Sequence, residues 1–281
     1  MLYNMSDILK PTRPGKFAIP AFNTSSNMIL TGAIEAAEEM NAPVIIEIHP
    51  DELSFVKETF VAYAREEAHK AKVPVCIHLD HGSDLADIMK AIQCGFTSVM
   101  IDGSSLPFEE NIAQTKKIVE VAHAVGVSVE AELGTIGTME GDDINYTVPA
   151  DAKRFVEETG VDTLAIAIGT RHGLYPKGLT PKIRLDLLEE ICQAVDIPLV
   201  LHGGSDNPDD EIEQAFLNGV SKLNISSDIK KAFYVKCREV LQDESLREPN
   251  AIYPPCIDAM KEVMKQKMDL FHTTGKAELY K

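Results

Sequence analysis

The chain has 281 residues, of which 44% are hydrophobic and 25% charged, and its formal net charge is −17. The length fits one closed α/β barrel, so we expect a single domain over residues 1–281. The negative charge disfavours nucleic acid and anionic membranes as partners, and no segment is apolar for long enough to span a bilayer. No signal peptide is recognisable, so we expect a cytoplasmic protein. Five scattered cysteines without a CxxC spacing argue against a disulfide framework or a thiolate metal site.

Short apolar segments recur along the chain, and stretches with the periodicity of amphipathic helices separate them. We predict eight parallel strands over 17–23, 43–49, 74–81, 98–103, 127–134, 164–169, 198–203 and 222–226. Between them we predict helices over 28–40, 84–94, 109–123, 151–159, 184–195 and 209–218. This alternation predicts an α/β fold, a (β/α)8 barrel. A doubly wound open sheet is disfavoured because the first turn, AFNTSSN, lacks a GxGxxG pattern.

Polar residues collect at the carboxyl ends of these strands, where barrels of this type carry their active sites. They are Asn23, Asp80, His81, Asp102, Glu132, His172, His202 and Asn224. The three histidines follow three different strands, and a closed barrel can bring them to one point. Three imidazoles that leave one position open are a standard ligand set for catalytic zinc. We therefore predict a Zn²⁺ site at His81, His172 and His202, although each histidine alone would more often be structural.

Six segments carry a resemblance to a known family: HLDHGSDL, MIDGS, VEAELGTIG, AIAIGTRHGLYPKG, PLVLHGGSDNPDDEI and NISSDIK. In this order they resemble the class II fructose/tagatose-bisphosphate aldolases, and SDNPDD is closest to the tagatose branch. The resemblance implies reversible cleavage of a ketose 1-phosphate or 1,6-bisphosphate to dihydroxyacetone phosphate and an aldehyde. It also implies one Zn²⁺ per subunit, a monovalent cation (Na⁺ or K⁺) near the phosphate, and a homodimer or homotetramer.

Such a cleavage needs a base at the C4 hydroxyl, an electrophile at the C2 carbonyl and a grip on the C1 phosphate. By resemblance, Asp80 exchanges the C4 hydroxyl proton, Glu140 moves protons at the enediolate carbon, and Asn224 hydrogen-bonds the enediolate oxygens. Asp102 and Glu132 match an alternative metal site or groups that orient its ligands, or else form an internal polar network. The family's phosphate-binding positions are Gly173, Gly203, Gly204, Ser205, Asn224, Ile225, Ser226 and Ser227. The backbone N–H groups at these positions would let an acidic protein bind phosphate through local donors.

Other functions fit the sequence less well. A Schiff-base aldolase needs a lysine inside the barrel near a strand end, whereas Lys222 is expected to open the last strand at the opposite end. A metal-dependent hydrolase would have an HxH pair where the first strand reads AFN. A non-catalytic barrel that supports a partner aldolase remains the alternative.

One departure from the family concerns the far end of the substrate. An arginine that binds the second phosphate in bisphosphate aldolases is replaced by Asn250, in EPNAIY. We therefore expect ketose 1-phosphates to be handled at least as well as the bisphosphates.

Overall fold

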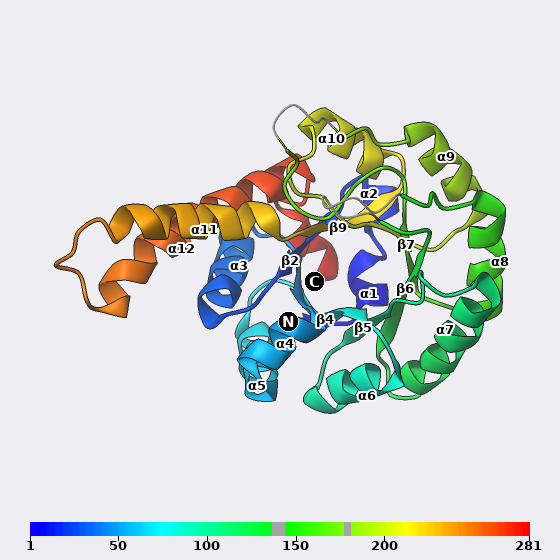
Figure 1. Cartoon of the computed structure of the whole chain (residues 1–281), viewed down its shortest axis with the longest axis horizontal. Coiled ribbons are helices and arrows are strands. Elements are labelled where there is room, and N and C mark those ends of the chain that lie inside the picture. The colour runs from blue at the N-terminus through cyan, green and yellow to red at the C-terminus, as the bar shows by residue number, and fades with distance from the viewer. Residues whose placement is uncertain (137–143, 177–180) are drawn as a thin grey trace.

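The computed structural model of the chain describes residues 1–136, 144–176 and 181–281. Eight parallel strands form a closed barrel, which confirms the predicted (β/α)8 fold (Figure 1). They are β2 (Ile19–Asn23), β3 (Val44–Ile48), β4 (Val75–Gly82), β5 (Ser98–Ile101), β6 (Ser128–Leu133), β7 (Thr163–Ile166), β8 (Leu199–Leu201) and β9 (Val220–Ile225). The barrel closes through the parallel pairing of β2 with β9 and of β4 with β5.

One short strand was not predicted. β1 (Leu2–Tyr3) pairs with β4, where Leu2 lies opposite Val75. Two apolar-aromatic residues at a terminus carry no strand periodicity, so only the neighbouring edge of β4 defines them as a strand.

The six predicted helices are present with small shifts at their ends: α3 (Asn27–Glu39), α6 (Leu85–Cys94), α7 (Phe108–His123), α8 (Pro149–Thr159), α9 (Leu185–Ala194) and α10 (Asp209–Leu217). Further helices are α1 (Met5–Leu9), α2 (Thr12–Gly15), α4 (Pro50–Val56), α5 (Glu58–Lys70), α11 (Ser227–Val240), α12 (Pro249–Leu270) and the 3₁₀ helix η1 (Lys276–Tyr280). No helix among these described residues is long and apolar enough to cross a membrane.

The barrel interior is layered, because side chains at every second position of a strand point to the same face. The layer at the amino ends of the strands is apolar, and α1 closes it with Met5, Ile8 and Leu9. The middle layer is polar and fully buried, and it comprises Glu47, His78, Glu130 and Lys222. The uppermost layer carries the polar residues of the carboxyl ends, Asn23, Asp80, Glu132, His202 and Asn224.

The position expected for Lys222 was wrong. β9 begins two residues earlier, at Val220, so Lys222 is a mid-strand residue. Its ammonium lies inside the barrel, 2.8 Å from Glu130 Oε2 and 2.7 Å from Glu47 Oε1. A lysine is therefore buried below the carboxyl-end layer.

Helices α11 and α12 form a hairpin that projects away from the barrel (Figure 1). The second half of this hairpin returns to the barrel along α3, where Lys261 bonds Glu35 and Glu39 at 2.8 Å and 2.6 Å. Asn250 is exposed in the first turn of α12.

Candidate active site

The structure brings the three predicted histidines together. His81 belongs to β4, His172 follows β7 and His202 follows β8, and one ring nitrogen of each lies within 4.8 Å of those of the other two. The ring centroids of His81 and His202 are 4.7 Å apart. His81 Nδ1 lies 2.8 Å from Asp102 Oδ2, which leaves Nε2 available. The Nδ1 of His202 is fully buried and has no hydrogen-bond partner among the described residues. An orphaned ring nitrogen beside two further imidazoles fits a metal ion.

Asp80 and His81 both face the cavity although they are consecutive in a strand. Alternation would place their side chains on opposite faces. His81 has a φ of 50°, and the pairing of β4 with β5 shifts register between Leu79 and Gly82. This irregularity turns His81 inward beside Asp80, which is how irregular strand ends commonly aim functional side chains.

The charges around the histidines favour a cation at this point. Burial opposes the charged form of His81, but the negative charge of Asp80 and the hydrogen bond to Asp102 outweigh it and raise the pKa of His81 to about 10. Burial and the neighbouring histidines lower the pKa of His172 to about 4, which favours the neutral ring, the form of histidine that can bind a metal. The carboxylates that hold a proton on His81 would equally hold a divalent ion in its place.

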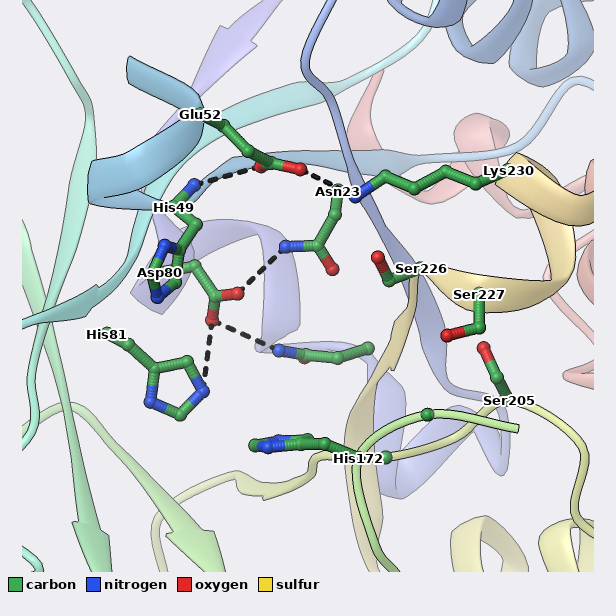
Figure 2. Close-up of a pocket in the computed structure, with 13 residues that line it drawn as sticks. Asn23, His49, Glu52, Asp80, His81, His172, Ser205, Ser226, Ser227 and Lys230 are labelled. Carbon is green, nitrogen blue, oxygen red and sulfur yellow. Dashed lines mark hydrogen bonds and ion pairs between the residues drawn. The ribbon is translucent and has the colours of Figure 1, made fainter. Parts of the chain in front are cut away.

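Asp80 is held by amide groups from two neighbouring strands, β2 and β9. Asn23 Nδ2 donates to Oδ2 at 2.8 Å, and Asn224 Nδ2 donates to Oδ1 at 3.2 Å. Burial would raise the pKa of Asp80, but the charges of His81, His202 and Lys222 outweigh it and hold the pKa well below its usual range. Asp80 is therefore an oriented carboxylate at the cavity wall (Figure 2).

Asp102 and Glu132 lie on the other side of His81, and the three together could also hold a metal ion. Glu132 Oε2 is 3.5 Å from His202 Nδ1. Burial, helped by the charge of Asp102, raises the pKa of Glu132 to about 8. Both interpretations of these residues, a second ion position or groups that orient the ligands, are compatible with this geometry.

The cavity beside the histidines has a volume of about 360 Å³, and most of the predicted phosphate positions line it. These are Gly173, Gly203, Ser205, Asn224, Ser226 and Ser227. Ser226 and Ser227 begin α11, whose amino end supplies N–H donors. Gly204 and Ile225 are not among the lining residues, and the Ile225 side chain packs in the hydrophobic core. Glu140 lies outside the described residues.

Several residues of the site were not predicted. His49, Glu52 and Lys230 line the same cavity, and Lys230 Nζ lies 2.6 Å from Glu52 Oε1 (Figure 2). His49 follows β3 by one residue and caps α4 through Nδ1. The sequence spacing of Glu47 and His49 could have predicted that His49 faces the cavity, because residues two apart in a strand point to the same face.

Lys222 is unsuited to Schiff-base chemistry even though it lies inside the barrel. Burial opposes its charge, but Glu130 and Glu47 outweigh this and raise its pKa above the usual value. A nucleophilic lysine needs a lowered pKa and access to the substrate. Lys222 is protonated, fully buried and paired with two carboxylates.

A closed barrel whose carboxyl end gathers three histidines and an oriented carboxylate is the scaffold of a metal-dependent enzyme. The family model described as "Fructose-bisphosphate aldolase class-II" matches residues 3–276. The chain therefore belongs to the class II fructose-bisphosphate aldolase family, and it is an aldolase, a carbon–carbon lyase.

Individual relatives agree with this assignment. A D-tagatose-1,6-bisphosphate aldolase subunit GatY from Klebsiella oxytoca is 41% identical over 95% of each chain. A fructose-bisphosphate aldolase from Thermus caldophilus is 37% identical over 99% of this chain and 100% of that protein. The crystal structure of the YdjI aldolase from Escherichia coli K12 superimposes with a TM-score of 0.90 at 36% identity, covering 99% of this chain and all of that one.

Proposed function

We propose that this aldolase domain cleaves a ketose 1-phosphate or 1,6-bisphosphate to dihydroxyacetone phosphate and an aldehyde, with one Zn²⁺ per subunit held by His81, His172 and His202. The buried, unpartnered Nδ1 of His202 is the observation that carries the metal assignment. Zinc bound there would supply a Lewis acid at the substrate carbonyl. Asp102 keeps the His81 ring oriented through Nδ1.

Proton transfer at the C4 hydroxyl is assigned to Asp80. Its carboxylate is ionised and held by the two asparagine amides, so it can accept a proton without first reorienting. Asn224 is positioned at the same cavity, where its amide can also bond substrate oxygens. The role of Glu140 in moving protons at the enediolate carbon rests on the family resemblance.

The C1 phosphate is assigned to the opening between β8 and α11. Gly203 and Ser205 follow β8, while Ser226 and Ser227 offer hydroxyls and the amino end of α11. Lys230 adds a positive charge to the same wall. A Na⁺ or K⁺ ion near the phosphate, a homodimer or homotetramer, and a cytoplasmic location complete the proposal on the basis of the resemblance.

A cleavage assay with metal-reconstituted protein tests this function. Ketose 1-phosphates and 1,6-bisphosphates of tagatose and fructose configuration are offered, and dihydroxyacetone phosphate is detected by a coupled reaction. We expect turnover of at least one phosphorylated ketose that disappears on chelation and returns with Zn²⁺. Zinc-loaded protein that releases no dihydroxyacetone phosphate from any of them would instead favour the non-catalytic barrel.

A further inference from the structure

A buried ion pair lies directly beneath the three histidines. Glu130 accepts two bonds from Lys222 Nζ, at 3.0 Å to Oε1 and 2.8 Å to Oε2. The same Oε1 lies 3.0 Å from His202 Nε2. All three side chains are fully buried, so water does not compete for these bonds. The contacts run in series from Lys222 through Glu130 to His202.

The hydrogen on His202 follows from this arrangement. A carboxylate that receives an ammonium on both oxygens is an acceptor only. The Nε2 of His202 must therefore donate to Glu130, and the lone pair of the ring is left on Nδ1. That nitrogen has no hydrogen-bond partner among the described residues and lies 3.5 Å from Glu132 Oε2. With Nε2 bound to Glu130, Nδ1 is the ring nitrogen of His202 that is free to join those of His81 and His172 at a metal ion.

We propose that Lys222, acting through Glu130, is a positioning residue that fixes the ring orientation and tautomer of His202 so that Nδ1 is presented to the metal. This inference rests on the proposed zinc site. It gives Lys222 a role other than Schiff-base chemistry. It also explains why an ammonium group is buried in the barrel although removing it from water costs free energy. Loss of hydrogen bonds that orient a metal-binding histidine typically weakens metal affinity about 10–100-fold.

Glu130→Gln is the deciding variant, because it conserves shape while removing the acceptor-only carboxylate. A glutamine can turn its amide NH₂ toward His202 and favour the opposite tautomer. We expect the Kd for Zn²⁺, measured by chelator competition, to rise about tenfold or more. In metal-free protein, ¹H–¹⁵N spectra of the imidazole rings should show His202 losing its pure Nε2–H form.

Lys222→Met leaves Glu47 and Glu130 without a counter-charge, and this can prevent folding. The zinc affinity of Lys222→Met is therefore compared with that of the double variant Lys222→Met/Glu130→Gln. If the pair acts as a unit, the double variant binds Zn²⁺ no more weakly than the weaker-binding single variant, and the effects are not additive.

Lys261→Met is the matched control. This lysine also bonds two glutamates, but it joins α12 to α3 on the outside of the barrel. We expect it to lower stability and to leave both zinc affinity and the His202 spectrum unchanged. Unchanged zinc affinity and tautomer in Glu130→Gln would overturn the inference while leaving the zinc site intact. Failure of the wild-type protein to bind Zn²⁺ would instead refute the proposed function.

Discussion

At the scale of single residues, the site depends on a local exception to strand geometry. A left-handed φ at a residue other than glycine costs on the order of 1–3 kcal/mol. His81 adopts a φ of 50° in the strand that also delivers Asp80. The cost is tolerated because the hydrogen bond to Asp102 and the charge of Asp80 hold the turned ring. The proposed proton-transfer group and one of the proposed metal ligands thereby come from adjacent positions.

Asp80→Ala should lower kcat by about 10²–10⁴, the usual contribution of a positioned acid or base. Zinc content should change little, because Asp80 contacts His81 only at 3.8 Å. Asp102→Ala is the contrasting variant, since Asp102 orients the His81 ring directly and its loss should weaken zinc binding. Turnover assays and metal analysis of both variants check this. Zinc lost from Asp80→Ala as readily as from Asp102→Ala would make Asp80 a structural residue.

His202→Ala should abolish tight zinc binding and cleavage, while the barrel stays folded. The ring is fully buried, but the apolar core that surrounds the barrel does not depend on the metal. Metal analysis, activity and circular dichroism measure the three quantities separately. Full activity in metal-free protein would refute the metal mechanism.

At the scale of elements, the turn after β8 determines how closely the backbone could approach a phosphate in the proposed site. Gly203 has a φ of 65°, and a Cβ at this position would lie 2.4 Å from the carbonyl oxygen of Arg171. Gly203→Ala should displace the loop and destabilise the protein by about 1–3 kcal/mol. It should also raise the KM for the sugar phosphate about tenfold, because ~1.4 kcal/mol of substrate binding is lost.

Gly126→Ala is the matched control for Gly203→Ala. Its φ is 75°, and nothing lies within 4 Å of the added Cβ. It should show only the backbone strain, about 1 kcal/mol, with an unchanged KM. Thermal unfolding and steady-state kinetics of the two variants separate the effects. Equal KM values would show that the turn after β8 does not shape the phosphate site.

Most of this architecture was predictable from local patterns. The apolar runs mark the eight barrel strands because a strand covered on both faces must be apolar, and the strand ends place His81, His172 and His202 together. Lys222 was missed as a member of the middle layer because the start of β9 was set two residues late, which moved this residue out of the barrel. Period-two pairing of Lys222 with Asn224 would have placed it inside.

At the scale of the whole molecule, a net charge of −17 has to coexist with an anionic substrate. At the cavity, positive character comes from Lys230 and from the amino end of α11. Carboxylates lie in the same cavity: Glu52 pairs with Lys230 at 2.6 Å, and Asp80 lines the cavity as well. The orientation of a sugar phosphate in this cavity is therefore set by local donors, and the overall field opposes its approach.

The projecting hairpin carries Asn250, the residue on which the expected sugar preference rests. Asn250 is exposed in the first turn of α12 and is not among the described residues that line the cavity. Asn250 therefore does not line the cavity of its own chain, and the expected effect of the missing arginine depends on the proposed oligomer. The cations that we consider as replacements for the arginine are Arg171, Arg247 and Lys276, and of these Arg247 precedes α12 on the hairpin.

We predict that wild-type kcat/KM for ketose 1-phosphates equals or exceeds that for tagatose 1,6-bisphosphate, because asparagine cannot supply the charge-assisted pair of bonds that arginine gives a phosphate. Asn250→Arg should raise kcat/KM for the bisphosphate about tenfold, worth ~1.4 kcal/mol, and leave that for the 1-phosphates unchanged. The gain should vanish on dilution to separated subunits. A wild-type preference of about a hundredfold or more for the bisphosphate, ~2.7 kcal/mol, would contradict this prediction. If Arg247→Ala then abolished that preference, Arg247 would be the cation that binds the second phosphate.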